Sequence, residues 1–243
     1  MGMMNIYLIR LFIILGCSLI LINSCRKLDQ IAPINFNKSI TYGNMTDQDG
    51  NIYKTVTIGT QIWMAENLKT TRYNNGELIG TTTPAATDIS GESTPGYQWA
   101  YDGNESNVAS YGRLYTWYTV NDSRNVCPTG WHVPSDAEWT ILTTCLGGES
   151  VAGGKLKETG TTHWQSPNTG ATNETGFTAL PGGLRYQDGT FDFIGGYGYW
   201  WSSTQSDPPT AWERNIYYNF TSVLKEGYFL KTYGFSVRCI KDN

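Results

Sequence analysis

The sequence predicts one α+β domain made mostly of short antiparallel strands and long loops, with a single clear helix. Three observations predict this fold class. The chain has 243 residues, 40% of them hydrophobic, which is enough for one sizeable core. Its 27 glycines and repeated Asp-Gly, Asn-Gly and Gly-Thr pairs separate short apolar runs, as turns separate strands. One segment, from about Ser135 to Leu146, carries a complete set of helix signals.

The first 24 residues have the pattern of an export signal. Arg10 precedes an almost uninterrupted apolar run from Leu11 to Ile22, which is too short to span a bilayer by itself. The residues that follow, Asn23-Ser24-Cys25, resemble the lipobox of bacterial lipoproteins, in which a small residue precedes a cysteine that is diacylated and becomes the N-terminus. We therefore expect residues 1–24 to be a lipoprotein signal peptide and Cys25 to carry the lipid, with palmitate among its acyl chains.

Two alternatives to lipidation at Cys25 remain open. Ile14-Leu15-Gly16-Cys17 also fits the box, although its apolar run is short. A cleaved secretory peptide would leave Cys25 as a free thiol in an oxidising compartment. Acyl chains bury methylenes at roughly 0.8 kcal/mol each, so a lipidated chain would stay on a membrane, most simply the outer membrane of the cell envelope. Arg26-Lys27-Leu28-Asp29 contains no acidic export tag, which leaves the membrane face open.

Residues 25–45 have no clear period and are predicted to be a tether for a domain spanning residues 46–241. Strand and turn signals then predict a β-meander up to Trp63, followed by a possible second helix at 64–68. Asp47, Asp49 and Asn51 match the start of a calcium loop. Ile58 stands at its twelfth position, where the loop needs a bidentate Glu, so an ordinary hairpin turn is favoured.

The helix from about Ser135 to Leu146 has a defined beginning and end. Ser135 is an N-cap, Glu138 completes a capping box, and the pair Gly147-Gly148 stops the helix. Apolar residues recur at steps of three and four, which predicts one buried face formed by Trp139, Leu142, Cys145 and Leu146. Beyond this helix, alternation predicts a hairpin of 212–218 with 228–230, and a closing strand at 235–240.

Charge and motif spacing argue against several function classes. The net charge is −4 and only 16% of residues are charged, which disfavours nucleic-acid binding. His132 and His163 are the only histidines, and neither has a second ligand at metal-helix spacing. The segment 151–157 resembles a phosphate loop but has Glu149 and Leu156 where that loop needs Gly and Ser or Thr. We expect no cofactor.

Catalytic sets are also missing from the sequence. A glycosidase needs two opposed carboxylates, and the sequence does not bring together any two of the available acids, Glu66, Asp122, Glu174 and Asp188. No serine stands in a nucleophile elbow. We therefore expect a protein that is not an enzyme. Aromatic residues make up 14% of the chain, and each ring serves either core packing or a sugar-stacking surface.

Six ordered blocks resemble the Fibrobacter succinogenes major paralogous domain, a family common in secreted proteins and lipoproteins. The resemblance covers roughly residues 46 to 241 and rests on segments 51–68, 111–115, 127–139, 180–183, 200–203 and 236–239. It implies no established activity. It does imply a C-type-lectin-like fold, shared with formylglycine-generating enzymes, in which the terminal strands pair. The sequence has no Glu-Pro-Asn triplet, so the calcium-dependent sugar site of true lectins does not transfer.

Three cysteines follow Cys25, which allows three possible pairs. We expect a disulfide between Cys127, before the helix, and Cys239, at the end of the last strand, because it would pin the C-terminus to the core. Cys145 would then be a free thiol on the buried helix face. A formylglycine-generating activity needs a thiol pair that holds a metal, and one cysteine does not supply it.

We expect a non-enzymatic binding or adhesion module that recognises a glycan or polysaccharide. The candidate contact residues lie in polar and aromatic loops and strands: Trp164, Asn168, Asp188, Tyr197, Tyr199 and Trp212. The first alternative is a structural or protein-binding surface lipoprotein with no small ligand. The second is a divergent enzyme of the formylglycine-generating type. We expect the protein to attach to the membrane through its lipid and to bind a glycan or another envelope protein. We expect no nucleic-acid partner.

Overall fold

A computed structural model describes residues 31–242, so the predicted signal peptide and Cys25 lie outside the described residues. Two five-stranded sheets and a two-stranded one contain all the named strands. The strands are β1 (Gly43–Thr46), β2 (Ile52–Ile58), β3 (Gln61–Met64), β4 (Gln98–Trp99), β5 (Leu114–Tyr115), β6 (Trp131–His132), β7 (Gly182–Arg185), β8 (Phe191–Ile194), β9 (Tyr197–Asp207), β10 (Thr210–Tyr217), β11 (Leu224–Leu230) and β12 (Ile240–Lys241). This mostly β arrangement with few helices confirms the predicted α+β class.

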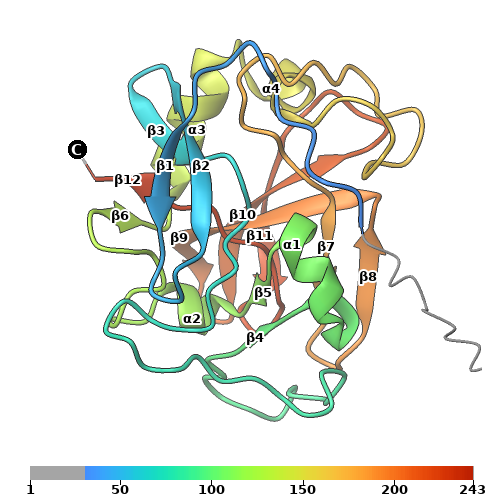
Figure 1. The fold of residues 1–243 in the computed structure, drawn as a ribbon. Helices are drawn as coiled ribbons and strands as arrows, with labels where there is room; N and C mark the ends of the chain where they lie inside the picture. The colour runs from blue at the N-terminus through green and yellow to red at the C-terminus, as the bar shows by residue number, and fades with distance from the viewer. Residues whose placement is uncertain (1–30, 243) are drawn as a thin grey trace, which may run out of the picture. The chain divides into compact units, whose positions relative to one another are not determined.

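The first sheet has the order β1-β2-β3-β12-β6, and the second has the order β11-β10-β9-β7-β8. Figure 1 shows β1 to β3 in blue and cyan at the left, and β7 and β8 in orange at the right. In the first sheet the C-terminal strand β12 joins the N-terminal strands, since Ile240 pairs with Trp63 of β3. In the second sheet β9 and β10 form a long antiparallel pair, in which Tyr197 lies opposite Tyr217. The strands β4 and β5 form the two-stranded sheet, and Tyr115 of β5 also makes an antiparallel bridge with Phe235.

The central helix α3 (Asp136–Cys145) begins and ends where the sequence predicts. The Ser135 hydroxyl accepts from the Glu138 N–H, and the Glu138 carboxylate accepts from the Ser135 N–H at 2.8 Å, which confirms the capping box. Trp139, Leu142 and Leu146 are buried as expected, whereas Cys145 is exposed and free. The prediction of a buried Cys145 is therefore wrong, because at about 3.6 residues per turn Cys145 lies at the edge of the face that Trp139, Leu142 and Leu146 form.

Four other helices are short: α1 (Val108–Tyr111), α2 (Trp117–Val120), and the 3-10 turns η1 (Tyr101–Gly103) and η2 (Glu105–Asn107). A further helix, α4 (Glu149–Leu156), was missed by the sequence reasoning because it contains two glycines. Their absent side chains allow the backbones of Thr221, Ser222 and Gly170 to approach. The helix predicted at 64–68 is wrong, since this segment ends strand β3 and continues as loop.

A buried polar hub joins the two sheets around Asn67. The side-chain oxygen Oδ1 of Asn67 accepts from Trp200 Nε1 and Arg238 Nε, both at 2.9 Å. Its amide nitrogen donates to the Tyr111 carbonyl at 2.9 Å and to Ser236 Oγ at 3.2 Å. All four side-chain bonds of this amide are therefore made inside the protein, where an unpaired polar group would be costly.

The aromatic core beside the hub connects helix α3 with strands from both sheets. Trp63 of β3 packs on Trp139 of α3 with ring centroids 4.8 Å apart, and Phe177 links both rings to Trp200 of β9. The disulfide between Cys127 and Cys239 lies in the neighbouring buried cluster, which confirms the predicted pair. Of the predicted closing strand 235–240, only Ile240 is regular strand, whereas Phe235 and Ser236 form isolated bridges.

The N-terminal segment 31–42 packs on the domain, so the predicted tether does not extend to residue 45. Ile40 and Tyr42 pack against the core, and the Asn35 N–H donates to Glu158 at 2.6 Å. The Ala32 carbonyl lies 2.9 Å from His163 Nε2, whose other ring nitrogen lies 2.7 Å from Glu158. Within residues 31–242, none of the helices has the length and apolar content needed to cross a membrane.

Candidate functional site

A surface groove of about 350 Å³ lies where the second sheet meets the loop after α4. We call it the Tyr197 groove. Its lining combines four aromatic rings with polar and aliphatic groups: Tyr101, Gln165, Asp192, Phe193, Ile194, Gly196, Tyr197 and Tyr218. A volume of this size is within the range of small-ligand sites.

The turn between β8 and β9 sets the position of the groove. Phe193 and Gly195 both have positive φ, at 66° and 80°, so the chain reverses tightly before Tyr197. The Gln165 N–H donates to the Gly195 carbonyl at 2.8 Å, which fixes the loop after α4 against this turn. The Tyr218 N–H donates to the Gly196 carbonyl at 3.0 Å, which brings the end of β10 to the same place.

Tyr197 is the centre of a strip of stacked rings. Its ring centroid is 4.1 Å from that of Tyr217 and 4.8 Å from that of Phe193. The ring of Tyr218 is nearly parallel to that of Tyr197, at 17° with centroids 6.4 Å apart. Tyr197 and Tyr218 are half-buried, so each residue keeps part of its surface in solvent. The part of an aromatic strip that stays exposed can contact an apolar face of a ligand.

Hydrogen-bonding groups surround these rings. The side chains of Gln165 and Asp192 are exposed in the groove. Burial, with a smaller contribution from Asp102, raises the pKa of Tyr101 to about 12, so its hydroxyl is a donor at neutral pH. The groove therefore offers carboxylate and amide oxygens as acceptors, and a phenol and an amide as donors.

A buried carboxyl group lies behind the strip. Glu213 of β10 is fully buried, and burial, together with the charge of Glu226, raises its pKa well above the ordinary value. The Asn215 amide donates to Glu213 at 2.8 Å and to Glu226 at 3.0 Å. Glu213 does not line the Tyr197 groove.

Three of the six predicted contact residues are core residues, which corrects the prediction that they reach a ligand. Trp164 is 1% exposed, and its indole N–H donates to the Ala179 carbonyl at 2.9 Å. Tyr199 is 3% exposed and stacks on Phe235. Asn168 is 6% exposed, and its amide closes a loop by donating to Glu158 and Gly160 carbonyls. Their surface is already covered by the protein.

The other three predicted residues lie at the surface but not together. Tyr197 lines the groove. Asp188 is exposed and accepts from the Thr190 N–H at 2.9 Å within a turn. Trp212 is half-buried on β10, where the ammonium of Lys225 lies 4.3 Å from the centre of its ring. Neither Asp188 nor Trp212 is among the groove residues.

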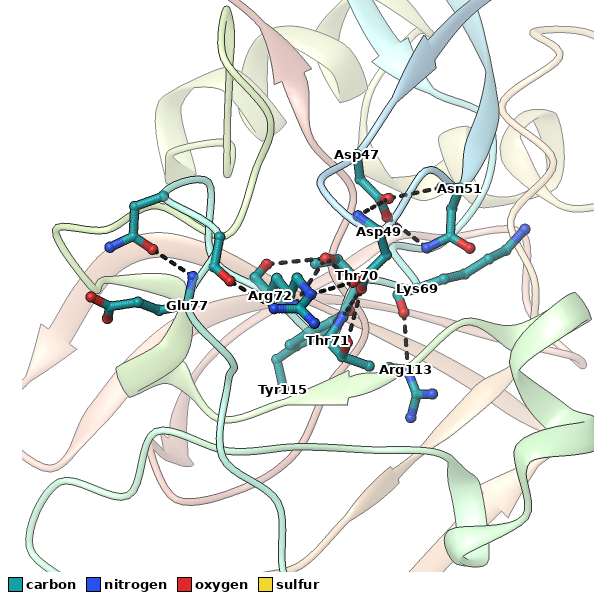
Figure 2. A network of polar contacts seen from close by, with 12 residues as sticks. Asp47, Asp49, Asn51, Lys69, Thr70, Thr71, Arg72, Glu77, Arg113 and Tyr115 are labelled. Atoms are coloured by element: carbon teal, nitrogen blue, oxygen red, sulfur yellow. Dashed lines mark hydrogen bonds and ion pairs between the residues drawn. The ribbon is translucent and has the colours of Figure 1, made fainter.

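The possible calcium loop is a hairpin turn whose carboxylates are held by the protein's own donors (Figure 2). Asp47 accepts from the Asp49 and Asn51 N–H groups at 3.0 and 2.9 Å. Asp49 accepts from the Thr71 N–H at 2.6 Å and pairs with Arg72 at 3.0 Å. Among residues 31–242, no group of three His, Cys, Asp or Glu side chains is placed to hold a metal ion.

The acids considered for catalysis have local partners instead of facing one another. Glu66 pairs with Lys69, Asp122 with Arg124, and Glu174 with Lys155. The exposed Cys145 does not line the Tyr197 groove.

Sequence reasoning missed Tyr101, Gln165, Asp192, Phe193 and Tyr218 as groove residues. One signal was available: aromatic residues stand in the Gly-rich segment at 197 and at the end of the predicted hairpin strand at 217–218. Strand ends adjoin loops, and loops commonly carry binding residues. The remaining residues come from segments far apart in the sequence, and no local pattern links them.

These features define a disulfide-linked α+β domain with an aromatic surface groove. The chain belongs to the Fibrobacter succinogenes major domain family, whose model matches residues 56–241. This match confirms the family predicted from the six blocks. No curated protein and no solved structure gave a match. The C-type-lectin-like fold implied by the resemblance stays a prediction.

Proposed function

We propose that this protein is a non-enzymatic, lipid-anchored module of the cell envelope that binds a glycan through the Tyr197 groove. The observation that carries the proposal is the strip of partly exposed rings next to Gln165 and Asp192. A sugar ring has apolar C–H faces and a polar rim of hydroxyls. Such a ligand matches a site that offers partly exposed aromatic rings together with hydrogen-bonding side chains.

A glycan-array screen with soluble protein beginning at residue 26 tests this proposal. We expect saturable binding to an oligosaccharide, followed by quenching or enhancement of the tyrosine and tryptophan fluorescence. Tyr197→Ala removes the central ring and is expected to weaken binding at least tenfold, because the apolar face of the sugar loses its stacking partner. Circular dichroism and thermal unfolding check that this variant is folded.

Tyr228→Ala is the matched control. Tyr228 is 65% exposed and does not line the groove, so its removal should leave binding unchanged. Equal losses in the two variants would contradict binding in the groove. No binding to any plant, bacterial or host glycan would overturn the glycan proposal and favour the structural or protein-binding alternative.

The lipid anchor is tested separately. We expect metabolic labelling with an alkynyl palmitate to mark the full-length protein and not its Cys25→Ala variant, and the variant to leave the membrane fraction. Labelling that persists in Cys25→Ala but disappears in Cys17→Ala would move the acylation site to the alternative box. Protease treatment of intact cells then determines which membrane face carries the domain.

A further inference from the structure

A second cavity, of about 360 Å³, lies beneath the loop 81–85 and shares no lining residue with the Tyr197 groove. We call it the Arg113 cavity. Its polar lining includes Thr71, Thr81, Thr83, Gln98, Glu105 and Arg113. Arg113 belongs to the block 111–115, on which the family resemblance partly rests.

The backbone holds the Arg113 guanidinium in a fixed orientation. Gly112 has φ of 71°, and a Cβ there would meet Asn67 and the Leu68 carbonyl, so only glycine lets the chain approach this closely. The Arg113 N–H then donates to the Leu68 carbonyl at 2.9 Å. Its side-chain Nε donates to the Lys69 carbonyl at 3.0 Å, an interaction visible in Figure 2.

The walls beside Arg113 are also fixed. Arg113 Nη1 donates to Gln98 Oε1 at 3.1 Å, so the Gln98 amide oxygen faces the guanidinium. Gln98 is 5% exposed, and no residue in 31–242 accepts from its amide nitrogen, which is left as a donor toward the cavity. Thr71 is anchored by two hydrogen bonds to Asp49, at 2.6 and 2.9 Å (Figure 2).

The remaining face of the guanidinium is covered by one exposed carboxylate. Arg113 Nη1 and Nη2 donate to the two oxygens of Glu105, at 3.1 and 2.5 Å. The Arg113 side chain is 11% exposed, whereas that of Glu105 is 69% exposed. Because the Glu105 side chain is mostly in solvent, its carboxylate can exchange Arg113 for water, provided that a ligand carboxylate takes its place on the largely buried guanidinium. The fork that it would vacate has the geometry that binds carboxylates.

The groups around that fork suit a ligand with hydroxyls. The hydroxyls of Thr81 and Thr83 are at the mouth, and neither has a hydrogen-bond partner among the described residues. With the Gln98 amide nitrogen, they provide donors and acceptors in the lining of the cavity that also contains Arg113. The cavity wall is completed by Trp99, which is 1% exposed.

We propose that the Arg113 cavity binds an acidic saccharide, a uronate residue whose carboxylate displaces Glu105 from Arg113 while its hydroxyls contact Gln98 and the threonines. The proposal does not rest on glycan binding in the Tyr197 groove. In this proposal Glu105 competes with the ligand carboxylate for Arg113. A neutral sugar has no carboxylate, so Glu105 would instead accept hydrogen bonds from its hydroxyls.

Glu105→Gln distinguishes a competitor from an acceptor, because it should raise the ligand affinity in the first case and lower it in the second. Isothermal titration of the folded protein with trigalacturonate is expected to show binding that becomes about threefold to fivefold tighter in Glu105→Gln, because the competing charge is gone. Neutral galactotriose should bind at least tenfold more weakly than trigalacturonate. Weaker uronate binding in Glu105→Gln would overturn the displacement mechanism, and equal affinity for both sugars would overturn the preference for acids.

Arg113→Lys keeps the charge but loses the fork, and should weaken trigalacturonate binding about tenfold or more. Tyr197→Ala should leave this binding unchanged, so failure of one site is distinguishable from failure of the other. A peptide ending in a free carboxylate serves as a second probe. Binding of the peptide with equal affinity would show that the carboxylate alone is recognised and would overturn the saccharide assignment. No binding of trigalacturonate to either wild type or Glu105→Gln would overturn the proposal as a whole.

Discussion

The hub around Asn67 and the Tyr197 groove are built from different parts of the sequence. Asn67, Trp200 and Arg238 each lie in one of the six blocks that carry the family resemblance. None of the residues that line the groove lies in any of these blocks. The blocks therefore supply the hub, whereas the Tyr197 groove is made by the segments between them.

This difference separates stability from recognition. Changes in the hub should destabilise the domain, because its polar atoms have partners only inside the protein. Changes in the groove should alter binding and leave the fold intact, because its polar side chains are exposed. Members of such a family can then share one scaffold and differ in ligand.

The largest effect is expected from removal of the disulfide. Replacing both Cys127 and Cys239 by Ala opens a loop with a sequence separation of 112 residues. The chain-entropy model predicts a loss of about 4 to 5 kcal/mol in the free energy of unfolding. Chemical denaturation of the double variant measures this loss. A loss below about 1 kcal/mol would show that the hub holds the C-terminus without the bridge.

Asn67→Ala tests the hub itself. It removes the acceptor of Trp200 and Arg238 and leaves a buried guanidinium with one partner fewer. We expect a loss of about 3 kcal/mol in urea denaturation. Asn219→Ala, at an exposed position, is the matched control and should change stability by less than about 0.5 kcal/mol. Similar losses in both variants would break the distinction between hub and surface.

Gln165→Ala tests the Tyr197 groove. The Gln165 side chain is exposed and makes no hydrogen bond with any described residue. We expect unchanged stability within about 0.5 kcal/mol, and glycan affinity reduced roughly fivefold by the loss of one hydrogen bond. Titration and thermal unfolding of the same sample measure both. A large loss of stability with unchanged affinity would assign Gln165 to the scaffold.

The smallest effect concerns His132, which links the C-terminus to α3. Its ring nitrogens lie 2.6 Å from Asp242 and 2.8 Å from Glu138. Burial lowers the pKa of His132, but the hydrogen bonds to Asp242 and Glu138 outweigh this effect and leave the pKa raised. The folded protein thus binds the proton more tightly than the unfolded chain. The stabilisation is complete below the unfolded pKa of about 6.5 and is lost as the pH rises through the folded pKa.

The wild type should therefore exceed His132→Gln in stability by more at pH 5.5 than at pH 9. The difference should be less than about 1 kcal/mol, because water screens this partly exposed site. Denaturation of both proteins at the two pH values measures it. A difference that does not change with pH, or that grows toward pH 9, would contradict a charged His132 in this pair.

The sequence by itself determined those helices and turns whose interacting residues lie within one helical turn or one hairpin. Helix α3 was predicted with its capping box because Ser135 and Glu138 are three residues apart and interact with each other. The turn at Asp47 and the hairpin of β10 and β11 follow from similar local patterns. The six blocks also determined the family. Helix α4 was missed because its two glycines are tolerated only through packing against distant backbone.

The tertiary structure alone decided which rings and carboxylates reach the surface. Three aromatic residues have similar surroundings in the sequence, in Gly-rich or polar segments: Trp164, Tyr199 and Tyr197. Only Tyr197 lies in a groove. Their exposure depends on what packs over them from elsewhere in the chain, such as Phe235 on Tyr199. The Arg113 cavity likewise depends on η2 bringing Glu105 to Arg113. Burial is a property of the assembled chain, so no single stretch of sequence contains it.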